Sequence, residues 1–192
     1  WGVFFNTISQ NVSNFFITSL FSLSQTGYFS YAMKYISIPI NMMGNALGQV
    51  LMQQASESRN TFGNARIEYI AILKKLLIIG IPSFTLLYFV VEPIFAWYFG
   101  EEWRIAGQYA KILVPYFFAR SIAMPLSVLN TVFEKQLLGL YWQAGLLVLT
   151  VGIFLIVKIN SWTLVEYLKL FSTILSVYYA TLVVILYFVA TG

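Results

Sequence analysis

One stretch of the chain carries polar side chains at helical spacing within an apolar background. Between residues 27 and 56, one helical face carries the cation Lys34 and the amides Asn41, Asn45 and Gln49. At about 100° per residue all four fall within about 80° on a helix, so they form a narrow polar stripe. A lysine inside a membrane-length helix costs about 3 kcal/mol to insert and usually faces a bundle interior or a water-filled cavity. The stripe therefore predicts a helix that lines a transport pathway.

A second cation, Arg120, lies near the middle of another apolar stretch. Ser127 and Thr131 share its helical face. A guanidinium presents a rigid fork that suits phosphate oxygens, and Lys34 would add a point charge. Two cations at membrane depth without a matching acid predict a binding site for an anion. The alternative is structural: Arg120 pairs with backbone carbonyls or with Glu134, and Lys34 extends outward to the membrane surface.

Other polar residues allow two interpretations each. Asn6 and Gln10 share one face of the first apolar segment, so they either line the same polar space or form interhelical hydrogen bonds worth about 1 kcal/mol each. Glu92 and Glu166 lie near helix ends, where they either bind a coupling cation or proton, or belong to solvated ends and local ion pairs. We expect the second interpretation for both glutamates because their depth in the membrane is shallow.

Composition excludes most soluble functions. Hydrophobic residues make up 59% of the chain and charged residues only 9%, whereas a soluble domain has about 25% charged residues. The net charge of +4 comes without a basic run among exposed aromatic residues, so nucleic acid binding is not expected. With no Cys and no His, we expect neither thiol chemistry nor a zinc site. No catalytic constellation or phosphate-binding glycine loop is present, so we expect neither an enzyme nor a cofactor.

The apolar segments define the predicted architecture. A bilayer core of about 30 Å requires about 20 apolar residues per helix. Six segments qualify: Gly2–Leu23, Tyr28–Leu51, Leu76–Phe99, Ala106–Phe133, Leu138–Val157 and Leu164–Ala190. All five prolines lie inside these segments, where transmembrane helices tolerate them. The sequence predicts an all-α integral membrane protein whose residues 1–192 form one bundle of six transmembrane helices, with successive helices antiparallel. Because apolar segments reach both ends of the chain, we expect a piece of a longer protein.

The only long connection is expected between residues 52 and 75. Its apolar residues recur at helical spacing and predict an amphipathic helix at about residues 61–75 that lies in the membrane interface. The connection also holds Arg59, Arg66, Lys74 and Lys75. Because basic residues gather in cytoplasmic loops, we expect this connection and Lys135 on the cytoplasmic side.

Two longer patterns resemble a known family. They are TGYFSYAMKYISIPINMMGNALGQVLMQQASE and IPSFTLLYFVVEPIFAWYFGEEWRIAGQYAKILVPYFFARSIAMPLSVL. Together they resemble the C-terminal half of Wzx-type flippases for O-antigen and other polysaccharides, in the superfamily of multidrug and toxin extruders and the lipid II flippase. The resemblance depends most on Gly27, Tyr28, Lys34, Pro39, Gly44, Gly48, Gln49, Gly100 and Trp103. The family often has Arg where this chain has Lys34, a difference that keeps the charge and loses the bidentate geometry.

The resemblance implies a twelve-helix transporter of the extruder type, built from two six-helix bundles around a central cationic cavity. This chain would supply helices seven to twelve, and its partner would be the missing N-terminal half. Such proteins move undecaprenyl-diphosphate-linked oligosaccharide, the repeat unit of O-antigen, capsule or exopolysaccharide, across the bacterial inner membrane by alternating access. Lys34 and Arg120 would then hold the diphosphate, and the amides of residues 6, 10, 41, 45 and 49 would contact the sugar.

Two other functions remain open from the sequence. A multidrug extruder half from the same superfamily would typically need a buried acid for its cationic drugs, and this chain places basic residues at depth instead. A membrane-embedded glycan polymerase would need a large external loop with reactive residues, and the expected external connections are only a few residues long. Membrane lipids are partners in every case.

Overall fold

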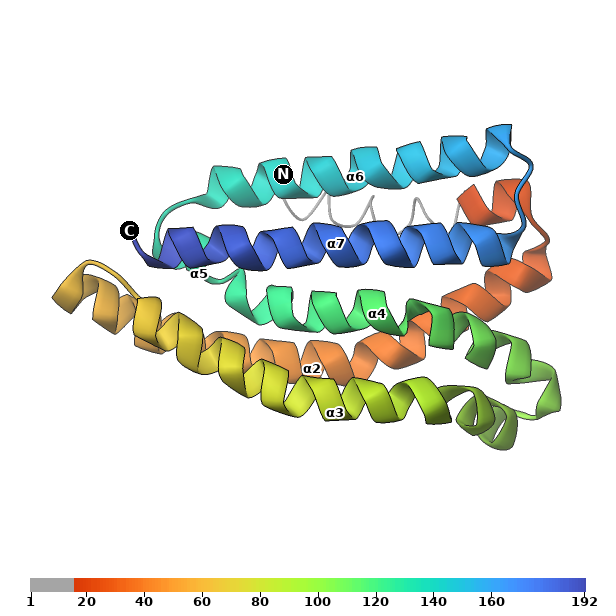
Figure 1. Ribbon diagram of the computed structural model, residues 1–192, viewed down its shortest axis with the longest axis horizontal. Coiled ribbons are helices and arrows are strands. Elements are labelled where there is room, and N and C mark those ends of the chain that lie inside the picture. The colour runs from red at the N-terminus through yellow and green to blue at the C-terminus, as the bar shows by residue number, and fades with distance from the viewer. Residues whose placement is uncertain (1–15) are drawn as a thin grey trace.

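The computed structural model describes residues 16–192 and is built from long helices that alternate in direction along the bundle (Figure 1). After a short helical segment at residues 16–20, the elements are α2 (Leu23–Phe62), α3 (Arg66–Phe99), the 3-10 helix η1 (Glu101–Trp103), α4 (Arg104–Leu126), α5 (Leu129–Val132), α6 (Gln136–Ile159) and α7 (Leu164–Ala190). The antiparallel order predicted from the short connections is confirmed. All five prolines lie inside helices, as expected.

Helix boundaries follow local side-chain chemistry. Ser22 and Thr163 begin α2 and α7 with reciprocal capping boxes to Gln25 and Glu166, so each helix start satisfies backbone donors that would otherwise lack partners. At the end of α2, Gly63 adopts a left-handed φ of 76° and its N–H bonds the carbonyl of Arg59. Glu166 is thus a capping residue at a helix end, in agreement with the structural interpretation of this glutamate.

Four of the described helices are long and apolar enough to cross a membrane, which makes the protein a multi-pass membrane protein. They correspond to four of the six predicted spans: Arg66–Phe99, Glu101–Val132, Gln136–Ile159 and Leu164–Ala190. Helix α2 has 40 residues, about 60 Å, but is not among them, because the polar residues that mark it also lower its hydropathy. Most of the first predicted span lies outside the described residues, so a bundle of six spans is not shown.

The prediction of a long connection between residues 52 and 75 is wrong. Helix α2 continues to Phe62, and α3 begins at Arg66 after a turn of three residues. The expected interfacial helix at about 61–75 is therefore not a separate element, because residues 66–75 are the first turns of α3. The apolar spacing that predicted an amphipathic helix has another cause: Tyr69, Ile72 and Leu76 pack against α2, α4 and α7 in the core at this end of the bundle.

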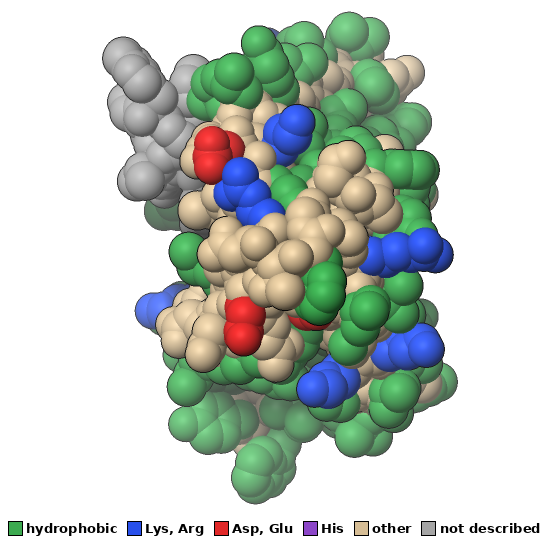
Figure 2. Space-filling view, turned by 90° about the vertical axis from the view of Figure 1, so that its left-hand side faces the viewer, with side chains coloured by type: hydrophobic (Ala, Val, Ile, Leu, Met, Phe, Trp, Pro, Cys, Tyr) green, Lys and Arg blue, Asp and Glu red, His purple; other side chains and the backbone are tan. Residues whose placement is uncertain are grey.

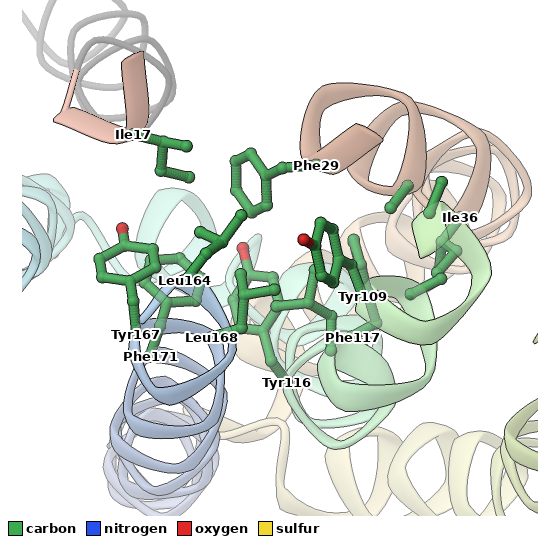
Figure 3. Packing of buried hydrophobic residues seen from close by; sticks show 14 of the residues in the cluster. Ile17, Phe29, Ile36, Tyr109, Tyr116, Phe117, Leu164, Tyr167, Leu168 and Phe171 are labelled. Carbon is green, nitrogen blue, oxygen red and sulfur yellow. The ribbon is translucent and has the colours of Figure 1, made fainter. Parts of the chain in front are cut away.

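Helix α4 lies at the centre of the bundle and packs against α2, α3 and α7. Figure 3 shows Tyr109, Tyr116 and Phe117 of α4 in one core cluster with Phe29 of α2 and Phe171 of α7, and the ring centres of Tyr116 and Phe171 lie 5.4 Å apart. Because α4 is enclosed on three sides, Arg120 is half-buried, whereas Gln108 near the start of the helix is exposed. Helix α6 stands apart from α4 and packs mainly against α7.

The small residues of α2 bring it close to α4, as the spacing GNALG predicted. Gly44 and Gly48 are buried, and a methyl group on either would lie 3.4–3.8 Å from Pro125 or Val128. Small-xxx-small pairs allow helix backbones to approach in this way. This contact fixes the rotation of α2 and so determines which way its polar stripe points.

Candidate functional site

A cavity of about 810 Å³ opens between α2, α4, α6 and α7. Its wall is mixed, with one cation, several amides, hydroxyl groups and two aromatic residues. The lining residues are Asn41, Asn45, Arg120, Ala123, Met124, Ser127, Asn130, Thr131, Gln136, Leu137, Gly139, Leu140, Trp142, Gln143, Tyr179 and Leu182. The cavity exists because α6 packs on α7 and leaves a gap between itself and α4.

The fold brings three of the predicted site residues together. Asn41 and Asn45 from α2 line the same cavity as Arg120 from α4. Gln49 lines a neighbouring pocket of about 230 Å³ that shares Asn45 with the main cavity. Lys34 is exposed and lines neither pocket. Asn6 and Gln10 lie outside the described residues.

Arg120 is a half-buried cation that has no acidic partner within residues 16–192. Its Nη1 donates to the hydroxyl of Tyr116 at 3.1 Å, and its guanidinium lies 6.0 Å from the centre of the same ring. Among the described residues no carboxylate lies within ion-pair distance of it. The alternative pairing with Glu134 is not formed, because Glu134 bonds Arg59 at 3.0 Å instead. The charge of Arg120 therefore has no acidic counter-charge among the described residues.

Four polar atoms of the cavity wall are buried without a hydrogen-bond partner in the part of the chain that the structure describes. They belong to Asn41 (Oδ1), Asn130 (Oδ1), Trp142 (Nε1) and Gln143 (Oε1). Native structures contain few such groups, because burying a polar atom unpaired costs about 1–3 kcal/mol. Their gathering in one cavity indicates a site that is completed by a polar ligand or by water.

The sequence reasoning overlooked Asn130, Trp142 and Gln143. The last two lie in the apolar run LGLYWQAGLLVLT, and Gln143 is its one amide. A single amide inside a membrane-length helix is the same kind of signal that identified α2. The indole of Trp142 stacks on Tyr178 with ring centres 3.7 Å apart, and the Tyr178 hydroxyl donates to the Trp142 carbonyl at 2.9 Å. These contacts give the α6 wall a fixed shape.

Glu92 lies at the opposite end of the bundle from the α2–α3 turn and is engaged by α4. Its carboxylate lies 3.8 Å from Arg104 and 3.7 Å from Lys111, and Gln108 donates to it at 3.3 Å. Lys111 also stands over the Tyr88 ring at 5.2 Å, so it faces α3 rather than the cavity. Glu92 therefore links α3 to α4 through ion pairs with these two cations.

Replacing Glu92 with glutamine tests this interpretation. We expect the free energy of unfolding to fall by about 1 kcal/mol or less, because partly exposed ion pairs contribute little. Thermal unfolding should be measured beside Glu102→Gln, a change at an exposed glutamate of the neighbouring turn. If the transport that the family resemblance implies is lost at unchanged stability, the coupling-ion interpretation of Glu92 is favoured instead.

Comparison with known proteins gives one match. A family model described as a polysaccharide biosynthesis protein matches residues 1–107, which include α2, η1 and all of α3. No curated protein and no solved structure matches the chain. The matched region carries the polar stripe of α2, and Arg120 lies thirteen residues beyond its end.

Proposed function

The chain belongs to the polysaccharide biosynthesis protein family of membrane transporters, and from this premise we propose that it is half of a flippase. The cargo is undecaprenyl-diphosphate-linked oligosaccharide, moved across the bacterial inner membrane by alternating access. The observation that carries the proposal is Arg120, a half-buried guanidinium that has no acidic partner among the described residues and lines a cavity with several amides. The transport itself makes or breaks no covalent bond of the glycan.

The electrostatics of the cavity suit the head group of this cargo. A diphosphate that crosses the membrane must leave water, at a cost that only a matching positive charge offsets. An internal acid would already neutralise Arg120 and weaken its attraction for the cargo. Tyr116 orients the guanidinium through a neutral hydroxyl, so the full positive charge remains available to phosphate oxygens.

The exposed part of the polar stripe extends the pathway beyond the cavity. Lys34 precedes Asn41 by seven residues on the same face of α2, about 10 Å along the helix. It forms no ion pair with the described residues. We assign it to the surface that faces the N-terminal six-helix half, where it meets the diphosphate in another step of transport. Asn6, Gln10 and Gln49 belong to the same proposed pathway.

The ends of the bundle give the proposed orientation. Figure 2 looks onto the end that carries the α2–α3 turn and the C-terminus, where basic side chains outnumber acidic ones. Arg59, Arg66 and Lys135 lie at this end, which we place in the cytoplasm by the positive-inside rule. The full domain is then a six-helix bundle over residues 1–192, in which α2 is one of the spans.

The rival functions fit less well. A multidrug extruder would use a buried acid, and the glutamate nearest to that role, Glu92, is already paired with two cations. A glycan polymerase would need a large external loop, and η1 with its flanking residues is short.

Complementation tests the proposal. The full-length protein, expressed in its own host lacking the endogenous copy, should restore surface glycan that is otherwise trapped as lipid-linked oligosaccharide inside the cell. The two pools should be measured together, because a polymerase defect would leave single repeat units at the surface. Resistance to cationic drugs without restored glycan would favour the extruder instead.

A further inference from the structure

We infer that the cavity contains a second subsite, formed by Asn130, Trp142 and Gln143, that binds the sugar residues next to the diphosphate. This inference rests on the proposed function and names residues of α5 and α6 that the polar stripe of α2 does not include. The subsite would recognise an uncharged polyhydroxyl group. It is separate from the cationic position at Arg120.

The chemistry of the unpaired atoms selects this class of ligand. Asn130 Oδ1 and Gln143 Oε1 accept hydrogen bonds, whereas Trp142 Nε1 donates one. A phosphate can serve only the donor, and a cation can serve only the acceptors. Sugar hydroxyl groups donate and accept, so one saccharide can satisfy all three atoms. The wall around them holds no charged side chain apart from Arg120.

The three residues line the cavity from other elements than the one that carries Arg120. Asn130 follows Arg120 by ten residues, about 15 Å along a helical path, and its amide lies next to Gly139 of α6. Trp142 and Gln143 are one turn further along α6, which runs antiparallel to α4 and so returns toward the level of Arg120. Arg120 lies instead against Tyr116 of its own helix. A lipid-linked glycan bound with its diphosphate at Arg120 would therefore direct its sugars toward α5 and α6.

The test uses the fact that an unpaired polar atom contributes no stability. Replacing it with an apolar group of similar shape should be neutral or stabilising, whereas removing a paired group should destabilise. Asn130→Leu and Gln143→Met make this change at the subsite. Thr150→Val is the matched control on α6, because Thr150 is buried away from the cavity and its hydroxyl is paired with the Leu146 carbonyl at 2.8 Å.

Binding of the purified full-length protein should be measured with two probes. One is undecaprenyl diphosphate, and the other is the undecaprenyl-diphosphate-linked oligosaccharide extracted from the protein's own host. We expect Asn130→Leu and Gln143→Met each to weaken binding of the glycosylated probe by about fivefold to tenfold, the usual effect of one lost hydrogen bond. Binding of undecaprenyl diphosphate should change by less than about twofold. Unfolding temperatures should stay equal or rise, and Thr150→Val should bind both probes as the wild type does.

The other outcomes separate the two proposals. If both variants bind the glycosylated probe as tightly as the wild type, the sugar subsite is wrong while the flippase proposal stands. If both variants unfold at lower temperature and lose both probes together, the amides are structural and the inference falls. If the wild type binds neither probe, the proposed function fails and the sugar subsite fails with it.

Discussion

Replacing Arg120 with alanine is expected to reduce glycan export by about 100-fold or more while the protein remains folded in the membrane. The reason is that Arg120 has no acidic partner among the described residues, so its removal leaves no internal charge unpaired. Its main internal contact is the hydroxyl of Tyr116, a neutral group. The substitution should therefore weaken binding of the cargo rather than the fold, because the diphosphate would face a cavity without a cation.

Two related variants define the role of the charge. Arg120→Lys should retain part of the export, because the charge stays while the planar fork that binds two phosphate oxygens is lost. Lys34→Ala should cost less than Arg120→Ala, because Lys34 is exposed outside the cavity. Export should be normalised to protein in the membrane fraction. Full export by the Lys34→Ala, Arg120→Ala double variant would refute binding of the diphosphate by these cations.

Replacing Gly107 with alanine is expected to destabilise the bundle by about 1–3 kcal/mol, and valine should prevent accumulation of folded protein. Gly107 lies where α4 meets α3. A methyl group there would stand 2.7 Å from the Cα and 3.0 Å from the carbonyl oxygen of Glu92. Backbone atoms cannot move aside as a side chain does, so α3 and α4 must separate. That separation would also disturb the ion pairs of Glu92 with Arg104 and Lys111.

Gly152 of α6 provides the matched control, because a methyl group there meets no atom within 4 Å. Gly152→Ala should be neutral or stabilise the helix by about 1 kcal/mol. Unfolding temperatures of the two alanine variants in detergent give the comparison. Equal stability of Gly107→Ala and Gly152→Ala would contradict the close approach of α3 and α4.

Apolar length and local capping were readable from the sequence because they depend on neighbouring residues alone. The segments from residue 76 onward correspond to described helices, and Ser22 and Thr163 cap helices as local hydrogen bonds require. The connection at residues 52–75 was misjudged for a physical reason. A hydropathy threshold ends a span where charged residues begin, but backbone hydrogen bonds continue a helix past the membrane surface, as α2 and α3 both do.

The candidate site, like the fold, was predictable from the sequence only in part. The sequence by itself identified Asn41, Asn45 and Arg120 as polar groups within long apolar runs, because the cost of inserting them in a membrane depends only on their chemistry and their place in such a run. Only the tertiary structure decided which of them share a cavity. The rotation of α2 follows from Gly44 and Gly48 against Pro125, and the opening beside Arg120 follows from the packing of α6 on α7 rather than on α4. Contacts between helices far apart in sequence set both, so Lys34 lies outside the cavity while Asn130 and Gln143 lie inside it.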